Sequence, residues 1–318
     1  MSSLRPFRFA TYGSANSRVE WVDQARKVES LGYSTLLLSN HIARGGLAPL
    51  PALLTAAEAT TTLRLGIHVV DNGFRHPAML AQEAATVDLL SDGRLELGIG
   101  MGWSPGDYEA MGMPFESPSV RLGKLRESVA LIKRLFQEDS VTFTGKHYNV
   151  RELNLQPKPL QRPYPPLYVG GGGKRILSFA AQEATIVGLA TKSTSGMLDH
   201  ASITADAVAE KVRWVREAAG AHFNDLELHI QAINIIITDD RQGGAKMTAE
   251  KLAGYSSIAV NNDLSTKQIL ESPHILIGTV DQIIETLLER RERYGISYIT
   301  LFGDEEKFSS MVARLAGK

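Results

Sequence analysis

Short apolar runs rich in Val, Ile and Leu alternate along this chain with longer segments in which apolar residues recur at helical spacing. The short runs are typical of strands buried on both faces, and the longer segments are typical of amphipathic helices. Strands are predicted at residues 7–12, 33–38, 65–70, 94–99, 167–169, 185–190, 228–237 and 297–302. Because helices are predicted between these strands, the pattern favours an α/β fold, a (β/α)8 TIM barrel.

The segment from residue 63 to residue 108 predicts a complete β-α-β unit. Its strands at 65–70 and 94–99 flank a helix that begins at Pro77 and stops at residues 91–93. Unusual residues collect where the two strands end, namely His68, Asp71, Gly98, Gly100, Met101, Gly102 and Trp103. Ligands of parallel α/β folds bind at the carboxyl ends of strands, so the active site is predicted there.

Composition narrows the possible functions. The chain has 318 residues, of which 43% are hydrophobic and 22% charged, and its formal net charge is −1. These values are typical of a soluble globular protein, and the absence of a basic excess disfavours nucleic acid as a partner. The chain contains no cysteine, which excludes disulfides, thiolate metal sites and thiol catalysis. With no apolar stretch long enough for a signal peptide or a membrane span, we expect a cytoplasmic protein.

We expect residues 1–318 to form a single barrel domain with insertions near 104–165 and 238–273. The first insertion contains a predicted helix at 120–137, a predicted hairpin at 141–148 and a proline-rich approach to the next strand. The second has no strong pattern. Neither a Ser-His-Asp motif nor a metal-ligand spacing such as HExxH occurs, so no metal site is predicted.

Four glycines at 170–173 directly precede a predicted helix and two cations, Lys174 and Arg175. Free backbone N–H groups at a helix start form an anion site, and glycine lets an anion approach them closely. A phosphate is therefore predicted at this position. The alternative, a flexible glycine turn, is less attractive because the helix and the cations follow at once.

Two further positions are candidates for proton chemistry. Asn40 and His41 end the second predicted strand, and His41 is equally compatible with being an ordinary loop histidine. Asp107 and Glu109 follow the fourth strand and could supply a proton, although acidic residues that open a helix more often serve as caps. A histidine suits acid-base work because its ordinary pKa lies near neutrality.

These residues carry a resemblance to a known family. Residues 64–103, the GIGMGW motif at 98–103 and the closing segment 278–302 resemble the luciferase-like monooxygenase superfamily, and more closely its coenzyme F420-dependent branch. The resemblance implies a homodimer and a non-proline cis peptide at His68-Val69 that supports the ring of a flavin or deazaflavin. It also implies a phosphate site that matches best at Gly172 and Gly173. The acid that commonly precedes the family histidine is replaced here by Asn40, which can hydrogen-bond a ring but carries no charge.

The first hypothesis is an F420-dependent oxidoreductase that moves hydride to or from a small organic substrate. The resemblance implies catalytic roles for His41 and Glu109, and cofactor binding by Asn40, His68, Val69, Asp71, Met101, Gly102, Gly172, Gly173 and Lys174. The second hypothesis keeps the fold but uses FMN and oxygen as a monooxygenase. A non-redox barrel enzyme with a phosphorylated substrate, and a ligand-binding protein without catalysis, are the third and fourth.

Overall fold

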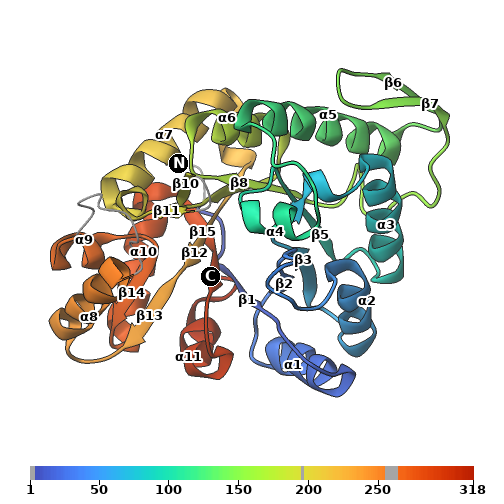
Figure 1. Ribbon diagram of the computed structural model, residues 1–318. Coiled ribbons are helices and arrows are strands. Elements are labelled where there is room, and N and C mark those ends of the chain that lie inside the picture. Colours follow the sequence, from blue (N-terminus) through green and yellow to red (C-terminus); the bar gives the residue numbers. More distant parts are fainter. Residues whose placement is uncertain (1–3, 195–196, 255–263) are drawn as a thin grey trace.

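Eight parallel strands close into a barrel in the computed structural model, which describes residues 4–194, 197–254 and 264–318. The barrel strands are β1 (Arg8–Tyr12), β2 (Thr35–Leu38), β3 (Arg64–Ile67), β5 (Leu95–Gly100), β8 (Leu167–Gly171), β9 (Ile186–Leu189), β12 (Glu227–Ala232) and β15 (Ile296–Leu301). They follow chain order around the barrel, and β15 returns to pair with β1. Each strand predicted from the sequence contributes to this barrel, so the predicted fold is confirmed (Figure 1).

Helices surround the barrel and link its strands (Figure 1). They are α1 (Arg18–Ser30), α2 (Pro49–Ala59), α3 (Pro77–Leu90), α4 (Pro105–Ala110), α5 (Pro118–Gln137), α6 (Lys174–Glu183), α7 (Ala205–Ala219), α8 (Arg241–Gly254), α9 (Thr266–Glu271), α10 (Val280–Tyr294) and α11 (Glu305–Leu315), with 3-10 turns at Asn72–Phe74, His200–Ile203 and Gly220–Asp225. Local chemistry sets their ends. Thr279 and Gln282 form a capping box at the start of α10, and Gly295 ends it with a φ of 75°.

The predicted strand at 228–237 is two strands, which corrects the sequence prediction. β12 ends at Ala232, and β13 (Asn234–Ile237) leaves the barrel to pair in parallel with β14 (Ile275–Gly278). The amide of Ile233 bonds to the carbonyl of His274 at 2.9 Å, which marks the point of departure. A continuous apolar run cannot reveal such a change of partner, because both strands bury their side chains.

Both predicted insertions contain regular structure. The first carries α4, α5 and the antiparallel pair β6 (Val141–Thr144) and β7 (Asn149–Leu153), which extends away from the barrel in Figure 1. The second contains α8 and α9, which the sequence analysis did not predict, and its residues 255–263 lie outside the described residues. After β9, β10 (Lys192–Thr194) and β11 (Met197–Asp199) form another antiparallel pair.

The amino-terminal end of the barrel holds a buried ion cluster. Arg8 pairs with Glu96 and, at 2.6 Å, with Glu227, while Arg64 pairs with Glu96 at 2.6 Å. Burial works to raise the pKa of Glu96, but Arg8 and Arg64 outweigh it and the pKa lies below its ordinary value. Polar groups at this end of a parallel barrel serve stability, so the reactive groups are expected at the opposite end.

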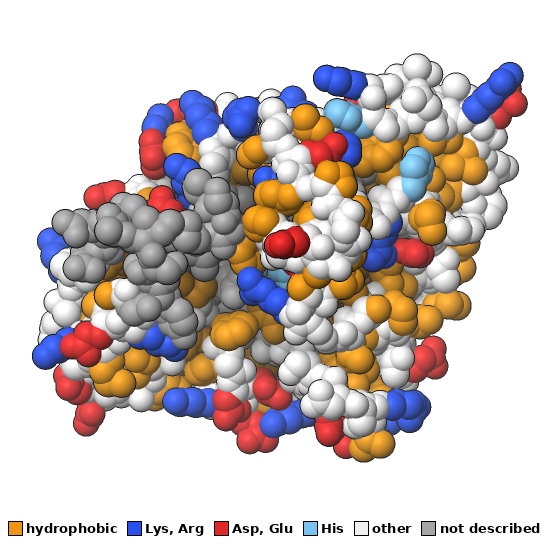
Figure 2. All heavy atoms as spheres, in the orientation of Figure 1, with side chains coloured by type: hydrophobic (Ala, Val, Ile, Leu, Met, Phe, Trp, Pro, Cys, Tyr) orange, Lys and Arg blue, Asp and Glu red, His pale blue; other side chains and the backbone are white. Residues whose placement is uncertain are grey.

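The surface carries both signs of charge. Figure 2 shows Lys and Arg side chains interspersed with Asp and Glu around the rim of one face, with many hydrophobic side chains nearer its centre. This mixture fits the formal net charge of −1. Among the described residues, no helix has the length and apolar character needed to cross a membrane.

Candidate functional site

The third strand is interrupted at its carboxyl end. β3 stops at Ile67, β4 (Val70–Asp71) resumes beside β5, and the peptide bond between His68 and Val69 is cis, as the family resemblance predicts. The amide of His68 bonds to the carbonyl of Leu38 at 2.8 Å, which ties this bulge to the end of β2. The bulge and the segment that carries Asn40 and His41 are therefore neighbours.

Gly98 and Gly100 make room for the bulge. A Cβ atom on Gly98 would lie 1.9 Å from the carbonyl oxygen of Ile67, and one on Gly100 would lie 2.5 Å from a methyl group of Val69. From their place in the predicted active site, these glycines could be interpreted as positions where a ring or a phosphate approaches the backbone. The structure corrects that interpretation, because the protein's own backbone and side chains occupy the space.

The side chain of His68 points into the barrel, where both ring nitrogens have partners. Nδ1 contacts the hydroxyl of Tyr12, and Nε2 lies 2.6 Å from the hydroxyl of Tyr168. Burial lowers the pKa of His68 to about 4, so the ring is neutral at pH 7. His68 is thus an interior group, and its predicted contact with a cofactor would come through its backbone.

His41 forms a pair with a buried carboxylate. Its Nδ1 lies 2.7 Å from Oδ2 of Asp107, whose Oδ1 accepts the amides of Ile42 at 3.1 Å and Ala43 at 2.8 Å. Burial works to raise the pKa of Asp107, but hydrogen bonds led by the one from His41 outweigh it and lower the pKa. An ionised carboxylate only accepts, so Nδ1 of His41 carries hydrogen and Nε2 is left to exchange a proton with a ligand.

Trp103 and Arg44 flank this pair. The Trp103 ring meets the His41 ring edge-on with centroids 5.6 Å apart, and the Arg44 guanidinium lies 4.9 Å from the centre of the Trp103 ring. Glu109 is exposed on α4, so the structure brings Asp107 and not Glu109 to His41. The catalytic role of Glu109 stays a prediction without a supporting contact among the described residues.

Asn40 is buried, yet its side-chain Oδ1 has no hydrogen-bond partner among the described residues. A buried carbonyl oxygen is seldom left unpaired, because its desolvation costs about 1–3 kcal/mol. A donor from a bound molecule would satisfy it. This orphaned oxygen fits a ring cofactor that presents an N–H or O–H group.

Asp71 supports the loop that follows β5. Its Oδ1 accepts the Tyr108 hydroxyl at 2.6 Å and the Gly73 amide at 2.8 Å, and its Oδ2 would lie 2.5 Å from a Cβ atom on Gly102. Burial raises the pKa of Asp71 above its ordinary value, against the opposing effect of these hydrogen bonds. The backbone carbonyl of Gly102 is held in turn by Arg121.

A cavity of about 60 Å³ adjoins this loop. Its walls include Met101, Tyr108 and Arg121, together with the charged side chains of Glu116 and Lys124. Of the predicted cofactor residues, Met101 therefore borders open space. The side chain of Asp71 is committed to holding the cavity wall.

Only two of the four consecutive glycines, Gly172 and Gly173, lie between the end of β8 and the start of α6. Gly170 and Gly171 belong to β8, while Gly173 is the N-cap of α6 with a φ of −115° and no side-chain cap. A Cβ atom on Gly172 would lie 2.4 Å from Cα of Lys192, whereas one on Gly173 would meet nothing within 4 Å. Exposed Lys174 lies 3.8 Å from Glu217. The amides at Gly173 and in the first turn can thus receive an anion.

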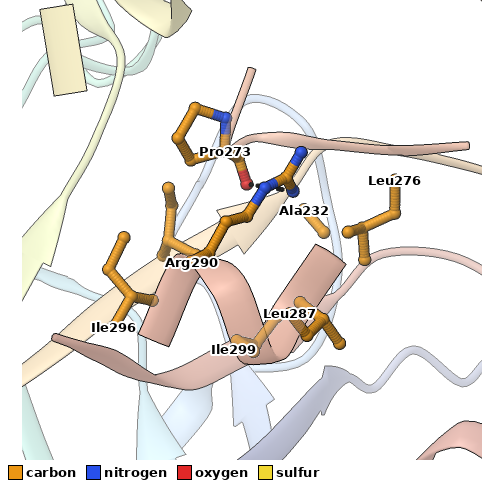
Figure 3. Close-up of a pocket in the computed structure, with 8 residues that line it drawn as sticks. Ala232, Pro273, Leu276, Leu287, Arg290, Ile296 and Ile299 are labelled. Atoms are coloured by element: carbon orange, nitrogen blue, oxygen red, sulfur yellow. Dashed lines mark hydrogen bonds between the residues drawn. The ribbon is translucent and has the colours of Figure 1, made fainter. Parts of the chain in front are cut away.

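Another small cavity, about 10 Å³ in volume, lies against the outer side of the barrel. Figure 3 shows Arg290 reaching from α10 to the carbonyl of Pro273, with Leu276, Leu287 and Ile299 nearby. Arg290 also bonds to the carbonyl of Ile275 at 2.9 Å. None of the predicted site residues lines this cavity, and its size suits at most one water molecule.

A family model described as luciferase-like monooxygenase matches residues 1–297. The chain belongs to this luciferase-like family. The structure agrees, since the coenzyme F420-dependent tetrahydromethanopterin reductase of Methanopyrus kandleri superposes with a TM-score of 0.76, 17% sequence identity and 99% coverage of both chains. At this identity the likeness establishes the fold alone.

Curated relatives of this luciferase-like chain include proteins that use different cofactors. The F420-dependent glucose-6-phosphate dehydrogenase of Intrasporangium calvum is 34% identical over 172 residues, 51% of each chain. The FMNH2-dependent dimethylsulfone monooxygenase of Pseudomonas putida is 26% identical over 210 residues, 66% of this chain and 53% of that relative. The chain therefore spans about half the length of these curated relatives.

The sequence analysis missed two features of the site. It did not predict that Asp107 would meet His41, because the two residues lie 66 positions apart. It also missed Tyr12 and Tyr168, which sit in two predicted strands and look like ordinary core aromatics. The available signal was the place of Tyr12 at the carboxyl end of the first strand; Tyr168 is the second residue of β8 and carried no such signal.

Proposed function

We propose that this protein is a coenzyme F420-dependent oxidoreductase that transfers hydride between the deazaflavin and a small organic substrate. The observation that carries the proposal is the His41–Asp107 pair, which lies at the carboxyl end of the barrel beside the bulge at residues 68–69. The F420-dependent relative at 34% identity supports this choice of cofactor.

The residues of this end of the barrel fit such a cofactor. The orphaned Oδ1 of Asn40 would accept a hydrogen bond from the ring, and the bulge at Val69 would support one ring face. The phosphate would bind the amides at Gly173, where a Cβ atom would meet open space. Lys174 is exposed on the first turn of α6 and would add positive charge.

His41 would handle the substrate proton. Asp107 fixes its Nδ1 as the protonated nitrogen, so Nε2 would act as the base for a substrate hydroxyl and, in the reverse direction, would return the proton. Buried Asp107 also stabilises the imidazolium that forms, by its negative charge at 2.7 Å. The deazaflavin, when bound, supplies the hydride chemistry itself.

An FMN-dependent monooxygenase is the second candidate, supported by the relative from Pseudomonas putida. Its ring would use the same bulge and the same phosphate site. The neutral Asn40 suits either ring, because an amide offers both a donor and an acceptor. A direct comparison of F420 and FMN binding separates the two hypotheses.

The test is equilibrium binding of F420 and, separately, FMN to the purified protein, followed by ring fluorescence. Gly173→Asp places a carboxylate where the phosphate would bind, while Gly173→Asn is nearly isosteric and neutral. Both Asp and Asn are good N-cap residues, and the site has room for a Cβ atom, so both variants should fold well. We expect selective F420 binding by the wild type, retained within about threefold by Gly173→Asn and weakened at least about tenfold by Gly173→Asp.

Each result has a distinct meaning. Binding of FMN alone would replace the proposal by the monooxygenase hypothesis. Binding of neither compound would refute the redox function and leave a non-redox barrel protein. F420 binding that Gly173→Asp does not weaken would keep the cofactor but move its phosphate away from α6.

A further inference from the structure

A chain of five polar side chains crosses the inside of the barrel. The Tyr168 hydroxyl stands between two imidazoles, 2.6 Å from Nε2 of His68 and 3.2 Å from Nδ1 of His229. At one end Nδ1 of His68 contacts the Tyr12 hydroxyl, and at the other Nε2 of His229 lies 2.7 Å from Oγ1 of Thr300. The described residues thus occupy both nitrogens of both rings.

The number of available protons determines which groups donate and which accept along these five side chains. Burial lowers the pKa of both histidines below the ordinary value, so each neutral ring has one N–H donor and one acceptor nitrogen. The Tyr168 hydroxyl must then accept from one ring and donate to the other. Phenylalanine at this position would leave two interior nitrogens, one on His68 and one on His229, without their partner.

The barrel makes space for this hydroxyl. A Cβ atom on Gly188 would lie 1.7 Å from the Tyr168 hydroxyl oxygen, and one on Gly170 would lie 2.7 Å from it. Glycine is therefore required in β9 for Tyr168 to adopt its position. Tyr298, another buried interior tyrosine, has its hydroxyl 3.0 Å from Glu96, in the ion cluster at the opposite end of the barrel.

We propose that Tyr12 and Tyr168 are positioning residues that clamp His68 and thereby fix the backbone at residues 68–69 against the cofactor ring. A ring held at both nitrogens cannot turn about its side-chain bonds, so the Cα atom of His68 and the adjoining peptide hold one position. Loss of either hydroxyl frees the imidazole on one side. The inference rests on the proposed function, because it takes the bulge to be the cofactor support.

The test compares Tyr168→Phe with Tyr298→Phe, since each variant removes one buried phenol hydroxyl. Affinity for F420 is measured by ring fluorescence, the visible absorption band of the bound ring is recorded, and Tm is measured without cofactor. We expect Tyr168→Phe to raise the Kd for F420 about tenfold, equivalent to about 1.4 kcal/mol, and to shift the band of the bound ring. Tyr298→Phe should lower Tm about as much as Tyr168→Phe does, but it should leave the Kd for F420 and the absorption band of the bound ring unchanged.

Tyr12→Phe is the second variant, because Tyr12 is only half-buried and its loss leaves the deep interior intact. It should raise the Kd for F420 in the same direction. A Kd within twofold of wild type for Tyr12→Phe and for soluble Tyr168→Phe would overturn the inference while leaving the proposed function standing. Equal increases in Kd for Tyr168→Phe and Tyr298→Phe would also overturn it, since the effect would then be general destabilisation. Wild-type protein that binds neither F420 nor FMN would refute the proposed function, and this inference with it.

Discussion

Mild acid should destabilise this protein through its buried histidines. His229 and His274 are 2% and 1% exposed, and burial is the main cause that lowers the pKa of both, that of His274 to about 3. Burial inside the barrel also lowers the pKa of His68, to about 4. Because the unfolded chain takes up these protons near pH 6.5, the stabilising effect is complete above that pH and is lost as the pH falls towards 4.

The magnitude follows from proton linkage. Between pH 6 and pH 5, a histidine that is protonated only in the unfolded state lowers the free energy of unfolding by about 1.2 kcal/mol. His229 and His274 together give about 2.4 kcal/mol, and His68 adds up to about 1.2 kcal/mol more. Carboxylates with a lowered pKa, such as those of Glu96 and Asp107, lose their contribution mainly at lower pH, outside this interval.

Urea unfolding at pH 6 and pH 5, followed by circular dichroism, measures this difference. His274→Gln keeps a donor for the Gln231 carbonyl, which lies 3.0 Å from Nδ1, but removes the titrating ring. We expect the pH-dependent loss to shrink by about 1.2 kcal/mol in this variant. His222→Gln is the matched control, since His222 is exposed and should leave the loss unchanged. An identical pH dependence in His274→Gln and wild type would refute the reasoning.

Two further predictions concern the site itself. In Asp107→Asn the carbonyl oxygen keeps the amides of Ile42 and Ala43, so the NH2 group faces Nδ1 of His41 and the ring should move its hydrogen from Nδ1 to Nε2. Side-chain ¹⁵N chemical shifts of His41 report the tautomer, and an unchanged tautomer would contradict the assigned pairing. Gly188→Ala should lower the free energy of unfolding by about 1–3 kcal/mol, because its Cβ atom overlaps Tyr168. Gly106→Ala, where a Cβ atom meets nothing within 4 Å, should cost less than about 0.5 kcal/mol in the same urea titration.

The barrel could be predicted from the sequence because each of its strands is a short apolar run with helical periodicity on either side. α3 and α10 also carried clear end signals, Pro77 for the first and Thr279 and Gly295 for the second. α8 could not be predicted with comparable ease. It is polar and contains Gly243 and Gly244, which disfavour a helix in isolation, and it forms where it packs near β14.

α11 was missed although its signals were present. Asp304 caps the helix by accepting the Glu306 amide at 3.0 Å, and Phe308, Met311 and Leu315 bury one face. The pairing of His41 with Asp107 is a different case. It depends on how the loops after β2 and β5 fold over the barrel, and such contacts between distant segments leave no periodic signal.

Glycine has two physical meanings in this chain, and only one of them indicates a ligand. Gly98, Gly100 and Gly188 lack a Cβ atom because neighbouring parts of the same chain fill that space. Gly173 faces open space at a helix start, where free amides attract an anion. In the sequence, Gly98, Gly100 and Gly173 all lie in similar glycine-rich stretches. Only the crowding around each glycine distinguishes a packing requirement from a binding site. This difference is why Gly173, and not the GIGMGW motif, is the position at which added negative charge should oppose cofactor binding.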